Sequence, residues 1–113
     1  MACITRSDRR ARIAREPMEF LVRIQVNWPP ETTPETRGRL TEAEAARGRE
    51  LIEAGQLHRI WRLPGRTANV SLYEAVDATE LHELLTSLPL WPLMEVSVEA
   101  LAVHPLESER SEA

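Results

Sequence analysis

The chain has 113 residues, of which 42% are hydrophobic and 28% charged, and its formal net charge is -4. This length suits one domain with one core, and no apolar stretch approaches the roughly 20 residues that span a bilayer. The one cysteine, Cys3, excludes an internal disulfide and a four-cysteine zinc site, which fits a reducing cytoplasm. The chain contains no lysine, so lysine Schiff-base chemistry is excluded.

The charge is unevenly distributed along the chain. Residues 1–17 carry five arginines and two acids, a net charge of +3, whereas residues 18–113 carry nine arginines and 16 acids, a net charge of -7. The acidic body argues against nucleic-acid binding as the main role. We expect residues 1–17 to be a disordered Arg-rich leader, or sequence upstream of a natural start at Met18, because no apolar periodicity ties them to a core. An arm for an anionic partner is the alternative, and the apolar core of a secretory signal is lacking.

The first half of the body predicts a strand followed by a helix. Residues 19–27 have apolar side chains at every second position, the pattern of a half-buried strand. The segment WPPETTP then breaks the strand. Thr33 is suited to cap a helix with Pro34 in its first turn, and the helix is expected to run to about Ala54, with Gly55 at its C-terminal cap.

The second half predicts two strands, a helix and a last strand. The segments QLHRIWRL (56–63) and TANVSLYE (67–74) alternate like strands, and Pro-Gly-Arg turns the chain between them. Asp77 and Glu80 form a pair like a capping box ahead of a leucine-striped helix. Residues 94–103 predict the fourth strand.

The expected element order is β-α-β-β-α-β, which is the ferredoxin-like arrangement of the α+β class. Its four-stranded antiparallel sheet has helices on one face only, so a second subunit's sheet is the expected cover for the other face. We therefore expect residues 18–105 to form the domain and to assemble at least into dimers. Residues 106–113 are expected to be an acidic tail.

Glu44 is an anomaly on the first predicted helix. It shares the helix stripe of Leu40 and Leu51, and a carboxylate on a buried stripe is costly unless it is paired or functional. Three interpretations are open. This end of the helix is exposed, or Glu44 pairs with Arg47, or Glu44 is a desolvated carboxylate whose raised pKa suits a general base.

Polar side chains also gather on the third predicted strand. Thr67, Asn69, Ser71 and Tyr73 share one face, which either meets water or a partner subunit, or lines a site. In the second case Asn69 is placed to donate a hydrogen bond to a developing oxyanion. Arg62, at the end of the second strand, is either a surface ion-pair residue or the holder of a substrate carboxylate.

The sequence gives no support for a metal or nucleotide site. His58, His82 and His104 lack metal-ligand spacing and have no cysteine near them. His104, at the end of the last strand, is interpreted as a structural or interface residue. There is no G-x-G-x-x-G, P-loop or G-x-S-x-G motif, so nucleotide cofactors and serine hydrolysis are not indicated.

The segment LPLWPLMEV (88–96) places Trp91 between two prolines. Pro89 and Pro92 rule out a regular helix, yet the segment is too apolar for an ordinary solvated loop. This proline corner is compatible with core, a subunit contact or the wall of a small-molecule pocket.

Residues 18–105 resemble the muconolactone delta-isomerase family in three blocks. MEFLVRIQV (18–26) is similar to the family's first strand. HRIWRLPGRTANVSLYE (58–74) is similar to its H/R-x-x-W-R-x-x-G-x-x-A-N-x-S block. LPLWPLMEVSVEALAVHP (88–105) is similar to its L-P-L-F/W-P-Y/L-M-x-x-x-V block, which ends in His-Pro.

The resemblance implies paired sheets in a dimeric α/β barrel, a ring-like decamer built of dimers, and no cofactor. The implied reaction moves a proton along an unsaturated lactone and turns muconolactone into 3-oxoadipate enol-lactone, in the β-ketoadipate pathway of aromatic breakdown. The family's catalytic glutamate and asparagine match Glu44 and Asn69. The residues expected to bind the substrate, a lactone carboxylate, are Arg62, Thr67, Ser71, Trp91 and His104.

Two positions depart from the family pattern. Thr67 stands where a tyrosine is usual, which enlarges the expected pocket, and Leu21 stands where a histidine is usual. Two alternatives therefore remain beside the isomerase. One is a related enzyme for another lactone, including a halogenated one that loses halide after proton removal. The other is a non-catalytic ferredoxin-like module that binds a ligand or oligomerises.

Overall fold

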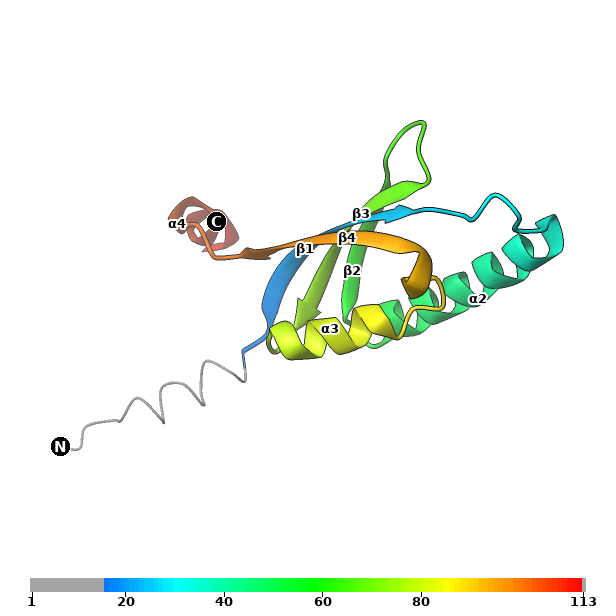
Figure 1. Cartoon of the computed structure of the whole chain (residues 1–113). Helices are drawn as coiled ribbons and strands as arrows, with labels where there is room; N and C mark the ends of the chain where they lie inside the picture. Colours follow the sequence, from blue (N-terminus) through cyan, green and yellow to red (C-terminus); the bar gives the residue numbers. More distant parts are fainter. Residues whose placement is uncertain (1–15, 113) are drawn as a thin grey trace.

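The computed structural model describes residues 16–112, which form the expected β-α-β-β-α-β unit followed by one more helix (Figure 1). Every strand and helix expected between residues 18 and 103 is present, with ends within two residues of the prediction. The elements are β1 (Met18–Val26), α2 (Pro34–Glu53), β2 (Leu57–Arg62), β3 (Ala68–Ala75), α3 (Ala78–Thr86), the 3-10 turn η1 (Trp91–Leu93), β4 (Met94–Leu101) and α4 (Pro105–Glu112).

The four strands form one sheet in the order β2-β3-β1-β4, and each neighbouring pair is antiparallel. Helices α2 and α3 lie on the same face of this sheet, while α4 extends beyond the end of β4 (Figure 1). The predicted α+β, ferredoxin-like fold is thereby confirmed.

Helix α2 begins and ends where the sequence predicts, and α3 begins where the sequence predicts. The Thr33 hydroxyl accepts a hydrogen bond from the Thr36 amide at 3.1 Å, and α2 ends just before Gly55, whose φ of 77° few other residues tolerate. At α3 the Asp77 carboxylate accepts from the Glu80 amide at 2.8 Å. The Glu80 carboxylate reaches back to accept from the amide of Val76, also at 2.8 Å, which completes the reciprocal capping pair.

The hydrophobic core lies mainly between α3 and the sheet. Its buried members are Phe20, Val22, Ile24, Leu51, Leu57, Tyr73, Ala75, Leu81, Leu84, Leu85 and Leu88. Helix α2 contributes a single buried residue, Leu51, although it is the longest helix described. Ile52 on α2 and Ile60 on β2 remain 52% and 53% exposed. Helix α2 is therefore not packed closely along the sheet, and this leaves room for a cleft.

In the middle of β3, polar residues face the helices and apolar residues face away from them. Ser71 pairs with buried Val22 on the helix side, whereas Val70 and Leu72 point to the outer face of the sheet. Trp61 of β2 joins them there with 47% of its surface exposed. An outer face of this composition supports the expected cover by a second sheet, which stays a prediction for the single chain described.

Residues 105–112 form a helix, α4, which the sequence did not predict within the expected acidic tail. Pro105 begins the helix, and the His104 carbonyl accepts from the Glu107 amide at 2.9 Å. Glu107 lies in the first turn and Arg110 in the last, with the two charges 3.9 Å apart, which suits the helix dipole. The predicted leader falls largely on residues 1–15, outside the described residues. Among the described helices, none is long and apolar enough to cross a membrane.

Candidate active site

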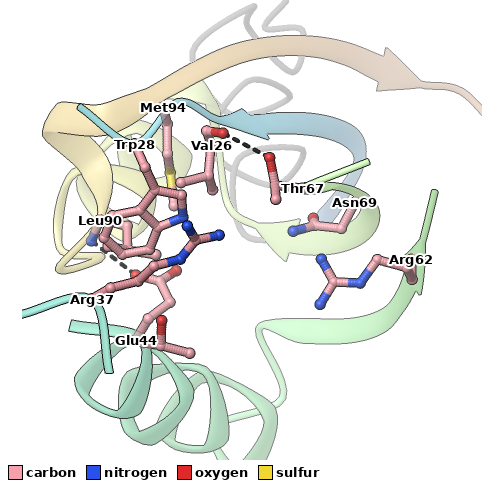
Figure 2. Close-up of a pocket in the computed structure, with 10 residues that line it drawn as sticks. Val26, Trp28, Arg37, Glu44, Arg62, Thr67, Asn69, Leu90 and Met94 are labelled. Carbon is pink, nitrogen blue, oxygen red and sulfur yellow. Dashed lines mark hydrogen bonds between the residues drawn. The ribbon is translucent and has the colours of Figure 1, made fainter. Parts of the chain in front are cut away.

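A cleft lies between α2 and the helix side of the sheet, and it consists of two adjoining cavities of about 350 and 330 Å³. These volumes fall at the lower end of the roughly 300–1,000 Å³ of small-molecule sites. The first cavity (Figure 2) is lined by Val26, Trp28, Arg37, Thr41, Glu44, Arg62, Thr67, Asn69, Leu90 and Met94. The second shares four of these, Thr41, Glu44, Arg62 and Asn69. The shared residues make the two cavities one continuous site.

Glu44 lies in the middle of α2 and is half-buried. Its Oε1 accepts a hydrogen bond from the backbone amide of Leu90 at 2.9 Å, so the proline corner fixes one oxygen of the carboxylate. Burial raises the pKa of Glu44, and the hydrogen bond from Leu90 opposes that rise in part. A carboxylate with a raised pKa is better suited to take a proton near neutral pH than an exposed glutamate.

The alternative in which Glu44 pairs with Arg47 is wrong. The Arg47 guanidinium bonds instead to the Glu50 carboxylate at 2.8 Å and to the Ser87 hydroxyl at 2.9 Å, outside the cleft. Among residues 16–112 no ion pair involves Glu44. The arginines that line the first cavity with Glu44, Arg37 and Arg62, therefore do not neutralise its carboxylate and are available to a bound molecule.

Asn69 is oriented by its neighbour Ser71. The Ser71 hydroxyl is fully buried and donates to Asn69 Oδ1 at 3.1 Å. With the amide oxygen turned to Ser71, the Nδ2 group is left as a donor for the cleft. Ser71 lines the second cavity, but its polar contact is with Asn69, so its direct contact with a substrate stays a prediction.

Arg62 lies beside Asn69. The two residues are register partners on β2 and β3, and both line the two cavities. Figure 2 shows the Arg62 guanidinium extending toward the Asn69 amide. Arg62 and Asn69 are seven residues apart in the sequence, and the pairing of β2 with β3 places these two donors side by side.

Thr67 lines the first cavity, but its hydroxyl is already engaged. It donates to the Val26 carbonyl at 2.9 Å and accepts from the Gln25 side-chain amide at 3.1 Å. Thr67 therefore widens the site relative to a tyrosine and does not offer a free hydroxyl proton.

Tyr73 lies at the bottom of the second cavity and is 2% exposed. Burial, together with the charge of Glu44, raises the pKa of Tyr73 to about 12, with Arg47 opposing the rise. Its phenol is therefore neutral at physiological pH and adds no negative charge beside Glu44.

Two predicted substrate-binding residues lie outside this cleft in their own chain. Trp91 packs against the core, with its ring edge to face with that of His82 at 6.2 Å. His104 lines a separate cavity beside Met18, and its Nδ1 accepts from the Leu106 amide. Since β4 separates the two sites, with seven residue steps of about 3.4 Å each, His104 cannot reach a molecule held at Glu44 of the same chain.

Trp28 and Arg37 line the first cavity and were not singled out in the sequence. The Arg37 guanidinium carbon lies 4.9 Å from the centre of the Trp28 ring. The spacing of Arg37, Thr41 and Glu44 (i, i+4, i+7) would have placed all three on one helix face.

The family model, the sequence relatives and the solved structure described below all point to the same family. The family model for muconolactone delta-isomerase matches residues 18–107. The chain is 38% identical over 87 residues to "Muconolactone Delta-isomerase 2" of Acinetobacter lwoffii, which covers 77% of this chain and 91% of the relative. It is 36% identical over 85 residues to the muconolactone delta-isomerase of Rhodococcus opacus, at 75% and 91% coverage.

A solved structure agrees with the sequence comparisons. The fold superposes on a crystal structure of muconolactone isomerase with a TM-score of 0.74 and 32% sequence identity, over 78% of this chain and 92% of the other. The region matched by the family model contains all four strands and helices α2 and α3. The chain belongs to the muconolactone delta-isomerase family.

Proposed function

We propose that this protein is a cofactor-independent isomerase that converts muconolactone to 3-oxoadipate enol-lactone in the β-ketoadipate pathway. Family membership supports the reaction class. The observation that carries the proposal is Glu44, a half-buried carboxylate with a raised pKa, opposite the Asn69 donor in a cleft of suitable size.

The proposed reaction needs one base and one donor. The proton leaves the ring carbon that bears the carboxymethyl group, because the electron pair left behind is conjugated through the ring double bond with the lactone carbonyl. The resulting dienolate carries its charge on the carbonyl oxygen. The proton then returns to the ring carbon next to the carbonyl, so the double bond moves and no atom is gained or lost.

Glu44 is the proposed base for both proton transfers. The two ring carbons are separated by a single atom, so one carboxylate can serve both from one face of the ring. Leu90 occupies Oε1 of Glu44, and no described residue donates a hydrogen bond to Oε2, which leaves this oxygen for the substrate. Asn69 is the proposed donor to the dienolate oxygen.

Family membership also supports a proposal for how the subunits assemble. The subunits pair through the outer face of the sheet into a dimeric α/β barrel, and dimers join into a decamer in the cytoplasm. The half-exposed Trp61 and the apolar outward residues of β3 support the sheet-to-sheet contact.

A second substrate is favoured by one observation. Thr67 is smaller than the tyrosine usual in the family, and its hydroxyl is bonded to the Val26 carbonyl. The added space would admit a ring substituent such as a halogen, which could leave as halide after proton removal.

The test is an ultraviolet assay of muconolactone conversion by the wild type, Glu44→Gln and Glu42→Gln. Wild type is expected to convert the substrate, and Glu44→Gln to lose roughly 10²–10⁴ in turnover, the usual range for a general base, with little change in KM. Glu42 is exposed on α2 and lines neither cavity, so its variant should match wild type. The proposal fails if wild type is inactive, or if Glu44→Gln keeps more than about a third of the activity, given the usual range for base loss.

A further inference from the structure

We infer that Arg37, held against the Trp28 indole, binds the substrate carboxylate, and that Arg62 acts with Asn69 at the lactone carbonyl. The inference rests on the proposed function and divides the work of the two arginines that line the first cavity. It changes the role expected of Arg62, which the sequence suggested as the carboxylate holder.

The Arg37 side chain is exposed, but its contact with Trp28 holds it in place. Its guanidinium carbon lies over the half-buried Trp28 ring, 4.9 Å from the ring centre, and an arginine that stacks on a ring uses the flat face of its guanidinium. The N–H edge is therefore free to form the paired hydrogen bonds that a carboxylate accepts. Among residues 16–112, no carboxylate forms an ion pair with Arg37 or with Arg62, so both remain available to an anion in the cleft.

The two arginines occupy opposite sides of the first cavity. Figure 2 shows Arg37 beside Trp28 on one side. On the other side it shows Arg62 beside Asn69. Arg37 belongs to the first turns of α2, and seven residue steps of about 1.5 Å separate it from Glu44 along the helix axis. A small ring held over Glu44 thus has one guanidinium toward each end.

Arg62 and Asn69 point to a single oxygen. Directly opposed residues on antiparallel strands have Cβ atoms about 4.5–5.5 Å apart. Ser71 fixes the Asn69 amide with its N–H groups toward the cleft. Two donors this close suit the carbonyl oxygen, on which charge develops during the reaction.

The substrate has two separate groups that a positively charged side chain can bind, its carboxylate and its lactone carbonyl. Its carboxylate carries a full charge throughout, whereas its carbonyl oxygen gains charge only in the dienolate. These oxygens lie on different sides of the ring, so a guanidinium beside Asn69 is badly placed for the carboxylate. Arg37 is the other arginine that lines the first cavity, and it remains for the carboxylate.

The two roles have different kinetic signatures. A group that holds the carboxylate equally before and during the reaction affects KM and leaves kcat nearly unchanged. A group that stabilises developing charge affects kcat. Kinetics of Arg37→Gln and Arg62→Gln on muconolactone and on its neutral methyl ester separate the two.

We expect Arg37→Gln to raise KM for muconolactone roughly 10–100-fold, the usual effect of losing a hydrogen-bonded charged partner, with kcat within about threefold of wild type. The same variant should leave KM for the methyl ester unchanged. Arg62→Gln should lower kcat on both substrates by roughly 10²-fold. Trp28→Leu should shift KM in the direction of Arg37→Gln, whereas Trp28→Phe, which keeps a ring face, should shift it less.

Arg39→Gln is the matched control, because Arg39 is exposed on the same helix and lines neither cavity. It should match wild type on both substrates, and thermal melts should show all variants folded. If Arg37→Gln behaves like Arg39→Gln, or if Arg62→Gln shows the charge-dependent rise in KM, the assignment is overturned.

A failure of the proposed function is distinguishable from a failure of this inference. If wild type does not convert muconolactone, calorimetry with the saturated lactone acid, which cannot isomerise, tests Arg37 alone. Binding lost in Arg37→Gln and kept in Arg39→Gln supports the inference. Equal binding by both variants, or no binding by wild type, overturns it.

Discussion

The pKa and the orientation of the Glu44 carboxylate depend on the hydrogen bonds of its neighbours. The Arg47 guanidinium, one turn away, is engaged by Glu50 and Ser87, so no ion pair lowers the pKa of Glu44. The Leu90 amide holds one carboxylate oxygen in place without neutralising the charge. The result is a fixed, half-desolvated anion, which is unfavourable for folding and useful for proton transfer.

The free energy of unfolding should depend on pH because the Glu44 carboxylate is partly buried. Because burial raises the pKa of Glu44 in the folded state above its unfolded value, the folded state binds the proton more tightly. Stability therefore falls as pH rises from the unfolded pKa through the folded pKa, and the cost persists at higher pH. Glu44→Gln removes the charge but keeps the hydrogen-bond acceptor.

We expect thermal melts to show Glu44→Gln more stable than wild type at pH 7, with the difference shrinking as the pH falls toward the unfolded pKa. The exposed Glu42→Gln variant should show no such pattern. A Glu44→Gln variant less stable than wild type at pH 7 would mean that the carboxylate contributes to folding as an ion.

At the scale of elements, α2 presents the base, and its start is fixed by a local cap. The Thr33 hydroxyl accepts from the Thr36 amide at 3.1 Å, while no described hydrogen bond uses the neighbouring Thr32 hydroxyl. Thr33→Ala should lower the free energy of unfolding by about 1 kcal/mol, as cap losses usually do. Thr32→Ala should have a clearly smaller effect in denaturant unfolding. Equal effects for the two variants would contradict the assigned cap.

The elements were predictable because their signals are local. Thr33, Gly55 and the Asp77–Glu80 pair marked helix ends through short-range hydrogen bonds or backbone geometry, and alternation marked the strands. Helix α4 was not expected, because its residues are polar and make no apolar stripe. Its signals are only Pro105 in the first turn and the placement of its charges.

The site was predictable only in part, because its partners are distant in sequence. Glu44 and Asn69 stood out as polar residues in buried patterns, and both line the cleft. The partner of Arg47 could not be read from helix spacing, since Ser87 lies 40 residues away. Nor could spacing reveal the contact between Trp28 and Arg37, which depends on how the loop after β1 returns to α2.

At the scale of the whole molecule, the sheet has one face occupied by helices and one without cover in the chain described. Trp61 and Ile60 are neighbours on β2 with similar exposure, 47% and 53%, but they point to opposite faces. Trp61 points to the outer face and Ile60 to the cleft. This pair allows the proposed sheet-to-sheet contact to be tested on one strand.

We expect wild type to be larger than a monomer by light scattering at micromolar concentration. Trp61→Glu should shift the protein toward monomers, because a charge would be buried in the contact, while Ile60→Glu should keep the wild-type mass. A monomeric wild type, or the same mass for both variants, would rule out pairing through the outer face.

The proposed lactone isomerisation depends on Glu44 as its base. Its most direct test is the pH dependence of kcat/KM for muconolactone, measured by ultraviolet absorbance. The base must be ionised to act, and burial raises the pKa of Glu44. Activity should therefore rise with pH through a single inflection above the ordinary glutamate range, and Glu44→Gln should lack this limb. An inflection at or below the ordinary glutamate range, or an acid limb that survives in Glu44→Gln, would contradict the account.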